Sequence, residues 1–196
     1  MKPSRFDRAF ELFDAFNAND PRRDEADDGS MDPRELLYAQ RMTDMLGRFE
    51  PASSEALRLA VRAQHIGRWA IPRADYPEGR IGYKQWRSRL MQYHAEIAAK
   101  ILRDVGYDDE TIARVRQLIR KQGLTRDDEV QTLEDVVCLV FLEHYFMDFA
   151  AKHDEEKIVD IVRKTWAKMS NRGQRAALEL DLSPETKRLV ARALRE

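Results

Sequence analysis

Apolar residues recur every three or four positions along almost the whole chain, and this spacing constrains the fold more than any other feature. The first segment shows it with Phe6, Phe10, Phe13 and Phe16. Side chains at this spacing share one face of an α-helix, and no segment shows the strict alternation of a half-buried strand. The chain has 196 residues, which suits one domain with a substantial core. We therefore expect a single all-α domain over residues 1–196, a bundle of about eight or nine helices.

Capping residues, glycines and prolines divide this pattern into separate helices. Ser4, Asp32, Asp108 and Ser183 are typical N-caps. The segment over 128–151 is apolar nearly all round, which is typical of a central, buried helix. Residues 21–31 are charged and without periodicity, and we expect an exposed, mobile loop there. The expected helices cover residues 5–16, 33–48, 54–65, 84–105, 109–122, 128–151, 154–170, 172–180 and 184–196.

Composition excludes several classes of partner. The 34 Lys and Arg residues nearly balance 35 Asp and Glu, for a net charge of −1, so no global field attracts nucleic acid or a membrane surface. No apolar run reaches the roughly 20 residues of a membrane helix, and the first residues lack a signal-peptide core. We expect a cytoplasmic protein whose anion site, if it has one, is local. The single cysteine, Cys138, lies in an apolar run and is expected to fill the core.

Three residues of metal-ligand type fall on the apolar stripes of three different helices: His65, His94 and Asp135. A buried imidazole or carboxylate costs roughly 2–7 kcal/mol unless it is hydrogen-bonded. These groups therefore need partners, and one solution is a shared divalent metal such as Zn, Mn or Fe. The other is a core histidine bonded to a backbone carbonyl or a carboxylate, and the sequence leaves both open.

An irregular segment over residues 70–83 combines prolines and glycines with arginines and aromatic residues, and it is the best clue to ligand type. Guanidinium groups match phosphate or carboxylate oxygens in pairs, and aromatic rings can stack on a base or sugar. We expect a small anionic or phosphorylated ligand there, although the arginines could instead pair with acidic residues across helices. The expected binding residues are Arg68, Trp69, Arg73, Tyr76, Arg80, Tyr83, Trp86 and Arg87, with Lys121 and Lys164 as further members.

Two motifs follow the order of a known ligand pattern. Gln64-His65-Ile66-Gly67-Arg68 precedes His94, and Leu133-Glu134-Asp135-Val136 follows it. Between residues 36 and 142, this order resembles the HD superfamily of metal-dependent phosphohydrolases, whose ligands are a His, a His-Asp dyad and a late Asp. Two positions depart from the pattern, because Tyr38 stands in the place of the first His and Ile66 in the place of the dyad Asp.

That resemblance implies two alternative functions. In the first, a metal held by His65, His94 and Asp135 activates water for attack on a phosphoester, and Glu134 or Glu96 accepts the proton. In the second, the metal has been lost and the module binds an anionic metabolite or a protein partner. The absent dyad Asp favours the second, while the main function that we expect is the first, a metal-dependent hydrolase acting on a small phosphorylated or nucleotide-like substrate. The sequence does not indicate an oligomeric state.

A closer resemblance covers most of the chain. It is carried by Gln64-His65, Arg68-Trp69, Ile71-Pro72-Arg73, Tyr76-Pro77, Gly82-Tyr83, Trp86-Arg87 and Lys164-Thr165-Trp166. This combination looks like an uncharacterised family of bacterial and fungal proteins known only as a domain of unknown function. The family implies no activity.

Overall fold

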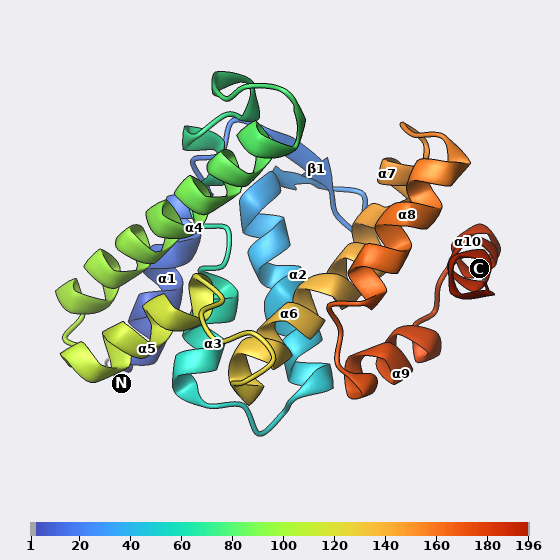
Figure 1. Ribbon diagram of the computed structural model, residues 1–196. Helices are drawn as coiled ribbons and strands as arrows, with labels where there is room; N and C mark the ends of the chain where they lie inside the picture. The colour runs from blue at the N-terminus through green and yellow to red at the C-terminus, as the bar shows by residue number, and fades with distance from the viewer. Residues whose placement is uncertain (1–2, 196) are drawn as a thin grey trace. The chain divides into compact units, whose positions relative to one another are not determined.

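The computed structural model describes residues 3–195, and within them the chain is almost entirely helical (Figure 1). The all-α prediction is confirmed, with ten α-helices in the described residues where eight or nine were expected. They are α1 (Arg5–Asn17), α2 (Arg34–Phe49), α3 (Glu55–Arg62), α4 (Gly79–Asp104), α5 (Asp109–Ile119), α6 (Asp128–Val140), α7 (Phe146–Ala150), α8 (Glu155–Trp166), α9 (Asn171–Glu179) and α10 (Pro184–Arg195).

Two compact units can be distinguished within the chain, and the prediction of a single domain stays a prediction. Unit 1 comprises residues 3–47 and 51–122, and unit 2 comprises Arg48–Glu50 and the chain from residue 123 onward. In unit 1, α5 packs against α3 and α4, and α1 packs against the same two helices (Figure 1). The predicted caps Ser4 and Asp108 begin α1 and α5, each accepting a backbone N–H bond.

Unit 2 is built around α6, which packs against α9, while α8 packs against α10. The helix predicted over 128–151 is interrupted by a π-helical turn at Phe141–Tyr145, after which α7 completes it. The Phe141 ring meets Phe146 and Phe149 edge-on, with centroids 5.9 and 5.8 Å apart. Periodicity located this helix correctly, but a one-residue insertion in its hydrogen-bond ladder leaves no signature in apolar spacing.

A short β-hairpin replaces the loop that was predicted over residues 21–31. Strands β1 (Arg23–Glu25) and β2 (Met31–Pro33) pair antiparallel, with Arg23 opposite Pro33. Most of the segment is exposed, as expected, yet ion pairs fix it to α2: Arg34 lies 3.2 Å from Asp24 and Arg41 lies 2.8 Å from Asp27. Because strands of three residues are too short to show alternation, these two strands could not be predicted from apolar spacing.

Helix α4 begins at Gly79, five residues before the predicted start at Lys84. Gly82 was interpreted as a helix breaker. It instead lies in the first turn of α4, where a Cβ atom would come within 1.9 Å of the Pro77 carbonyl oxygen. The preceding loop is tied down by Arg73, which donates hydrogen bonds to the Tyr76 and Pro77 carbonyls at 2.8 and 2.9 Å. The irregular segment is therefore shorter than the predicted 70–83.

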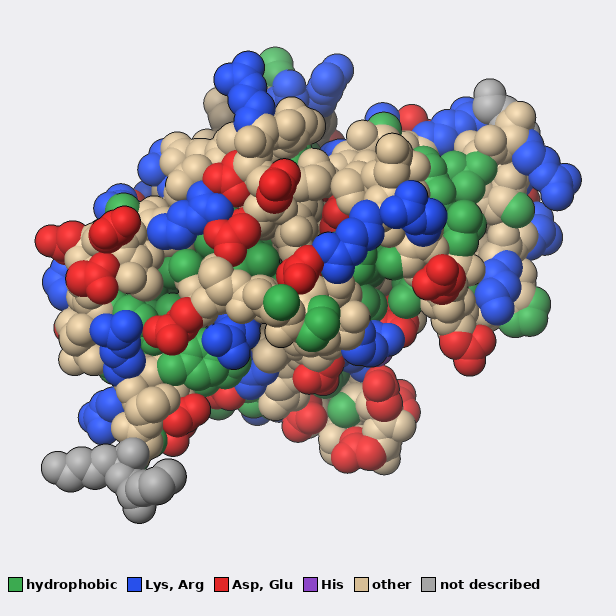
Figure 2. All heavy atoms as spheres, turned by 90° about the horizontal axis from the view of Figure 1, so that it is seen from below, with side chains coloured by type: hydrophobic (Ala, Val, Ile, Leu, Met, Phe, Trp, Pro, Cys, Tyr) green, Lys and Arg blue, Asp and Glu red, His purple; other side chains and the backbone are tan. Residues whose placement is uncertain are grey.

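Acidic and basic side chains are interspersed over the face drawn in Figure 2, with apolar side chains between them. This distribution matches the near balance of charges in the sequence. Among residues 3–195, none of the helices has both the length and the apolar character needed to cross a membrane.

Candidate anion-binding site

His65 lies in a turn that directly follows α3, three residues beyond the end of the helix in which it was predicted. Gly67 closes this turn with φ +69°, a left-handed conformation that favours glycine. The Gly67 N–H donates to Oδ1 of Asn17 at 3.1 Å, and a Cβ atom at this position would lie 2.8 Å from the Phe16 ring. The hydrogen bond to Asn17 and the close approach of Phe16 therefore fix the turn, and with it the position of His65.

The His65 ring is surrounded by one carboxylate, one guanidinium and two rings. Its Nδ1 lies 3.5 Å from Oε2 of Glu35, and its Nε2 lies 3.3 Å from Nη1 of Arg68. Tyr38 stacks on the ring with 4.2 Å between centroids, and the His94 centroid lies 5.8 Å away. Because a guanidinium only donates, Nε2 of His65 accepts the Arg68 hydrogen bond and Nδ1 carries the proton toward Glu35.

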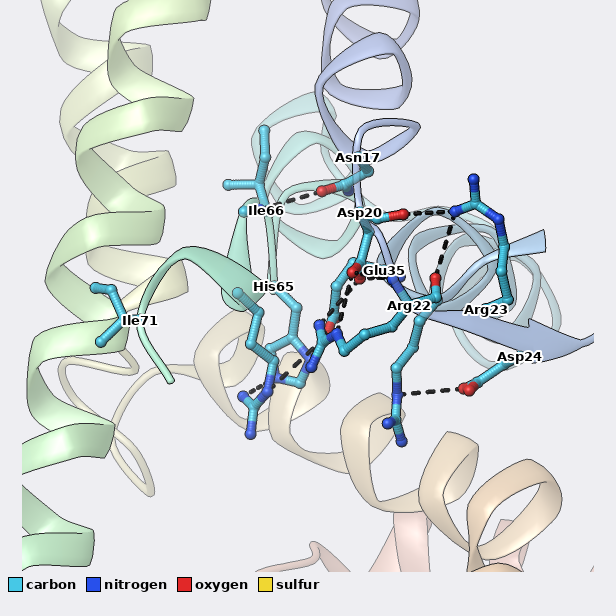
Figure 3. Close-up of polar contacts among 12 residues, drawn as sticks. Asn17, Asp20, Arg22, Arg23, Asp24, Glu35, His65, Ile66 and Ile71 are labelled. Atoms are coloured by element: carbon cyan, nitrogen blue, oxygen red, sulfur yellow. Dashed lines mark hydrogen bonds and ion pairs between the residues drawn. The ribbon is translucent and has the colours of Figure 1, made fainter. Parts of the chain in front are cut away.

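Glu35 joins His65 to a second set of charges on the hairpin side of the cluster (Figure 3). Its side chain is only 4 % exposed, and its Oε1 accepts a hydrogen bond from Nη2 of Arg22 at 2.9 Å. Arg22 also forms a bidentate pair with Asp20, at 3.0 and 2.9 Å. Asp20 in turn accepts from the Glu35 backbone N–H at 3.2 Å, in the first turn of α2. The Glu35 carboxylate is therefore already hydrogen-bonded to Arg22 through Oε1, in addition to its contact with His65 through Oε2.

His94, on α4, is fully enclosed and half satisfied. Its Nδ1 lies 2.6 Å from the Ile66 carbonyl oxygen, which can only accept, so Nδ1 carries the proton. Its Nε2 is then a bare acceptor, and it is buried without a hydrogen-bond partner in the described residues. An orphaned buried acceptor costs about 1–3 kcal/mol. The interpretation of His94 as a core histidine bonded to a backbone carbonyl therefore accounts for Nδ1 but not for Nε2.

Burial and nearby cations together keep both histidines neutral. Burial holds the pKa of His65 well below its ordinary value, and the charges of Arg68, Arg87, Lys121 and Arg22 lower it further. Burial also lowers the pKa of His94, to about 3. At Glu35 burial raises the pKa, against the lowering effect of the arginine charges.

The charge of Arg68 is only partly satisfied by its neighbours in the cluster. Its side chain is 21 % exposed, its guanidinium stacks over Trp86 at 4.8 Å, and its Nε lies 4.0 Å from Oε1 of Glu35. Within residues 3–195 its one hydrogen bond goes to His65. Arg87, one turn of α4 from Tyr83, makes no hydrogen bond or ion pair with a described residue. The cluster therefore has more positive charge than its two carboxylates neutralise.

Four other predicted binding residues, Trp69, Arg73, Arg80 and Tyr83, have no hydrogen bond, ion pair or ring contact with His65 among the described residues. The Arg73 guanidinium donates its hydrogen bonds within its own loop, to the carbonyls of Tyr76 and Pro77. Arg80 is exposed on the first turn of α4. Trp69 packs on Phe16 with 5.9 Å between ring centroids, and half-exposed Tyr83 packs on Trp86 at 5.8 Å. Composition alone could not show that Arg68 would lie against His65 while Arg73 bonds within its own loop and Arg80 is exposed.

The predicted metal residues do not form a metal centre in the described residues. Asp135 is buried as expected, but it belongs to unit 2, where its carboxylate accepts from Gln131 and twice from Ser170. Glu134 is also buried on α6, and Glu96 is exposed on α4. Among residues 3–195 no three His, Cys, Asp or Glu side chains are grouped so that they could hold a metal.

The donor atoms at His65 also do not fit a metal. Nε2 of His65 faces a guanidinium, Nδ1 of His94 faces a carbonyl, and Glu35 is bonded to Arg22. The Zn, Mn or Fe site and its catalytic bases stay predictions that the described residues do not support. Lys164, predicted as a ligand residue, is exposed on α8 and paired with Asp160.

A family model described as a domain of unknown function (DUF4202) matches residues 7–190, nearly the whole chain. The chain therefore belongs to this family, in agreement with the resemblance seen in the sequence. No curated protein and no solved structure matches the chain.

Three site residues were missed by the sequence analysis: Asp20, Arg22 and Glu35. The helix dipole is already a sufficient explanation for an acidic residue such as Glu35 in the first turn of a helix. Arg22 lies in the segment that was expected to be an exposed loop, and Asp20 directly precedes that segment. Only the Asp20–Pro21–Arg22 sequence, with acid and base two positions apart before a helix, carried a signal for a local ion pair.

Proposed function

We propose that the cluster around His65 binds a small, phosphate-bearing metabolite, and that the chain acts as a binding module without a catalytic metal. The observation that carries this proposal is the state of Arg68. Its guanidinium is largely buried, has one hydrogen bond in the described residues, and lies 4.0 Å from a carboxylate already bonded to Arg22. Buried charges are normally paired, so an external anion is the partner that best explains this arrangement.

Trp86 supports the proposal by holding Arg68 in place. Its indole Nε1 donates to the Ile71 carbonyl at 2.9 Å, and its ring lies beneath the Arg68 guanidinium. A guanidinium held against an aromatic plane keeps its N–H fork directed outward, as bidentate recognition of a phosphate requires. Arg87 supplies a second guanidinium that lacks an acidic partner in the described residues.

Neutral His65 contributes polarity without competing charge. A protonated imidazole would add a further buried cation beside Arg68, and the lowered pKa of His65 avoids this. The proposal includes the HD-like ancestry suggested by the sequence, with the ligand positions taken over by Tyr38 and Ile66, and the predicted cytoplasmic location. A small metabolite is preferred to nucleic acid because the net charge is −1.

Calorimetric titration with inorganic phosphate and with a panel of nucleotides and sugar phosphates tests the proposal. We expect binding, and a loss of at least tenfold in affinity in Arg68→Met and in Arg87→Met, because charge-assisted hydrogen bonds are removed. Arg80→Met is the matched control, since this exposed arginine lies on the same helix as Arg87. Its affinity should equal that of the wild type.

Two results would contradict the binding module. One is the absence of binding or thermal stabilisation by any member of the panel. The other is stoichiometric metal in protein purified without chelator, lost in His65→Ala and accompanied by phosphatase activity, which would support the metal-dependent hydrolase instead.

A further inference from the structure

The bare Nε2 of His94 is a buried polar atom that anion binding alone does not explain. His94 is 2 % exposed, and its Nδ1 is fixed on the Ile66 carbonyl, so the ring cannot turn its second nitrogen to solvent. Buried polar atoms of folded proteins are nearly always hydrogen-bonded, and an exception indicates a bound molecule or a functional role. Other buried side-chain atoms of unit 1 without a hydrogen-bond partner among the described residues include Oε1 of Gln64 and Nδ2 of Asn17.

The surroundings of His94 define the chemistry of the group that Nε2 accepts from. The atom is a lone-pair acceptor, so its partner must be a donor. The positive charge of Arg68 lowers the pKa of His94, so a cationic donor such as an ammonium would meet repulsion from Arg68. An anionic oxygen is excluded because it only accepts. A neutral O–H or N–H satisfies this atom, and of the two a hydroxyl is the group that phosphate metabolites commonly carry.

His94, which carries the unpartnered acceptor, and Arg68 both lie beside the ring of His65. His94 packs on His65 with 5.8 Å between centroids, and Nη1 of Arg68 lies 3.3 Å from Nε2 of His65. Arg68 and His94 are thus both neighbours of His65, and a small molecule that spans them would have its phosphate at Arg68 and another of its groups at His94. We propose, on the basis of the proposed anion binding, that the ligand is a phosphate ester carrying a free hydroxyl, which donates a hydrogen bond to Nε2 of His94.

A matched pair of probes tests this inference: glycerol 3-phosphate and n-propyl phosphate have the same chain length and charge, and differ in their hydroxyl groups. By calorimetry we expect wild-type protein to bind glycerol 3-phosphate about tenfold more tightly, the effect of one buried hydrogen bond. In His94→Asn the ratio should fall to about one, with the affinity for n-propyl phosphate kept. The Asn amide N–H can replace Nδ1 at the Ile66 carbonyl but does not replace Nε2.

His153→Asn is the control, because His153 makes the same kind of bond from Nδ1 to the Phe149 carbonyl, at 2.8 Å, in unit 2. This variant should keep the wild-type ratio. A readout in the unaltered protein is the ¹⁵N resonance of His94 Nε2, which should move upfield with glycerol 3-phosphate and stay in place with n-propyl phosphate.

The outcomes separate the two proposals. If both probes bind wild-type protein equally, or if His94→Asn keeps the preference, the hydroxyl inference is overturned while anion binding stands. An unmoved Nε2 resonance in saturated protein overturns it as well. If neither probe nor any of the panel binds, the anion site itself is wrong, and the inference falls with it.

Discussion

The cluster around His65 in unit 1 and the cluster around Asp135 in unit 2 begin from the same sequence feature, a polar residue on an apolar helix stripe, and end in opposite states. The Asp135 carboxylate accepts from Nε2 of Gln131 at 3.0 Å and from the backbone N and Oγ of Ser170 at 2.8 and 2.5 Å. Around His65, by contrast, the Arg68 guanidinium has one hydrogen bond and Nε2 of His94 has none within residues 3–195. A polar residue in a core thus indicates a site only when its hydrogen-bonding capacity is left unused.

The largest effect should come from breaking the satisfied cluster. Asp135→Ala removes a buried acceptor and strands the donors of Gln131 and Ser170, and we expect a loss of about 3 kcal/mol in the free energy of unfolding. Asp135→Asn keeps the shape and some of the bonds and should lose less. Urea denaturation followed by circular dichroism measures both. A change below about 0.5 kcal/mol in Asp135→Ala would contradict the structural role given to this carboxylate.

A steric change at the same cluster should follow. A Cβ atom on Gly173 would lie 2.6 Å from Cγ of Asp135, so Gly173→Ala should destabilise unit 2 by about 2 kcal/mol. Gly47→Ala is the control, because a Cβ there meets no atom within 4 Å, and the helix α2 should gain about 0.5–1 kcal/mol. Opposite signs in the same denaturation assay are expected, and a neutral Gly173→Ala would show that α9 can shift away from Asp135.

The two buried histidines of the cluster around His65 should make the free energy of unfolding depend on pH. The pKa of His65 and that of His94 are lowered in the folded chain, so on acidification the unfolded chain takes up these protons first. Stability should be level above about pH 7 and fall below about pH 6.5, by roughly 1.4 kcal/mol per pH unit for each histidine. The raised pKa of Glu35 acts in the opposite sense, because the folded chain binds that proton more readily.

Denaturation at several pH values, in wild type and in His94→Asn, checks this dependence. The variant lacks one of the two titrating rings, and its slope should be smaller by about 1.4 kcal/mol per pH unit. A profile that is level from pH 7 to pH 5 in the wild type would show that the histidines are not held neutral.

The smallest effect is expected at a residue outside both clusters. Lys164 was predicted to bind ligand, but it pairs with Asp160 one helical turn away, and both side chains are more than half exposed. Lys164→Ala should therefore change the free energy of unfolding by less than about 0.5 kcal/mol. Its affinity for inorganic phosphate should equal that of the wild type in the titration proposed for Arg68→Met.

The helices were largely predictable because their apolar faces and caps are local features. Ser54 and Asp127 cap α3 and α6 through their own side chains, and the amino acids nearby suffice to locate such ends. The hairpin and the early start of α4 were not predictable. Three-residue strands carry no pattern, and the role of Gly82 depends on the Pro77 carbonyl folding back onto it.

The candidate site was predictable in its parts but not in its pairing. His94 was correctly expected to be buried with a polar partner, and Arg68, Trp86 and Arg87 were among the residues expected to bind an anion. Sequence alone could not show that Glu35 is shared between Arg22 and His65, because that contact depends on how the hairpin meets α2. Nor could it show which nitrogen of His94 lacks a partner.

The close fit of Gly82 on Pro77 makes the loop and the start of α4 a single stiff piece, and this gives an experimental handle. Ile81, beside Gly82, is 76 % exposed, while the chain's single thiol, Cys138, is buried in the other unit. In Ile81→Cys the new thiol should therefore react selectively with a maleimide dye. Because the backbone beneath it is rigid, changes in the fluorescence of such a reporter would follow occupancy at Arg87, two turns further along the helix, rather than local fraying.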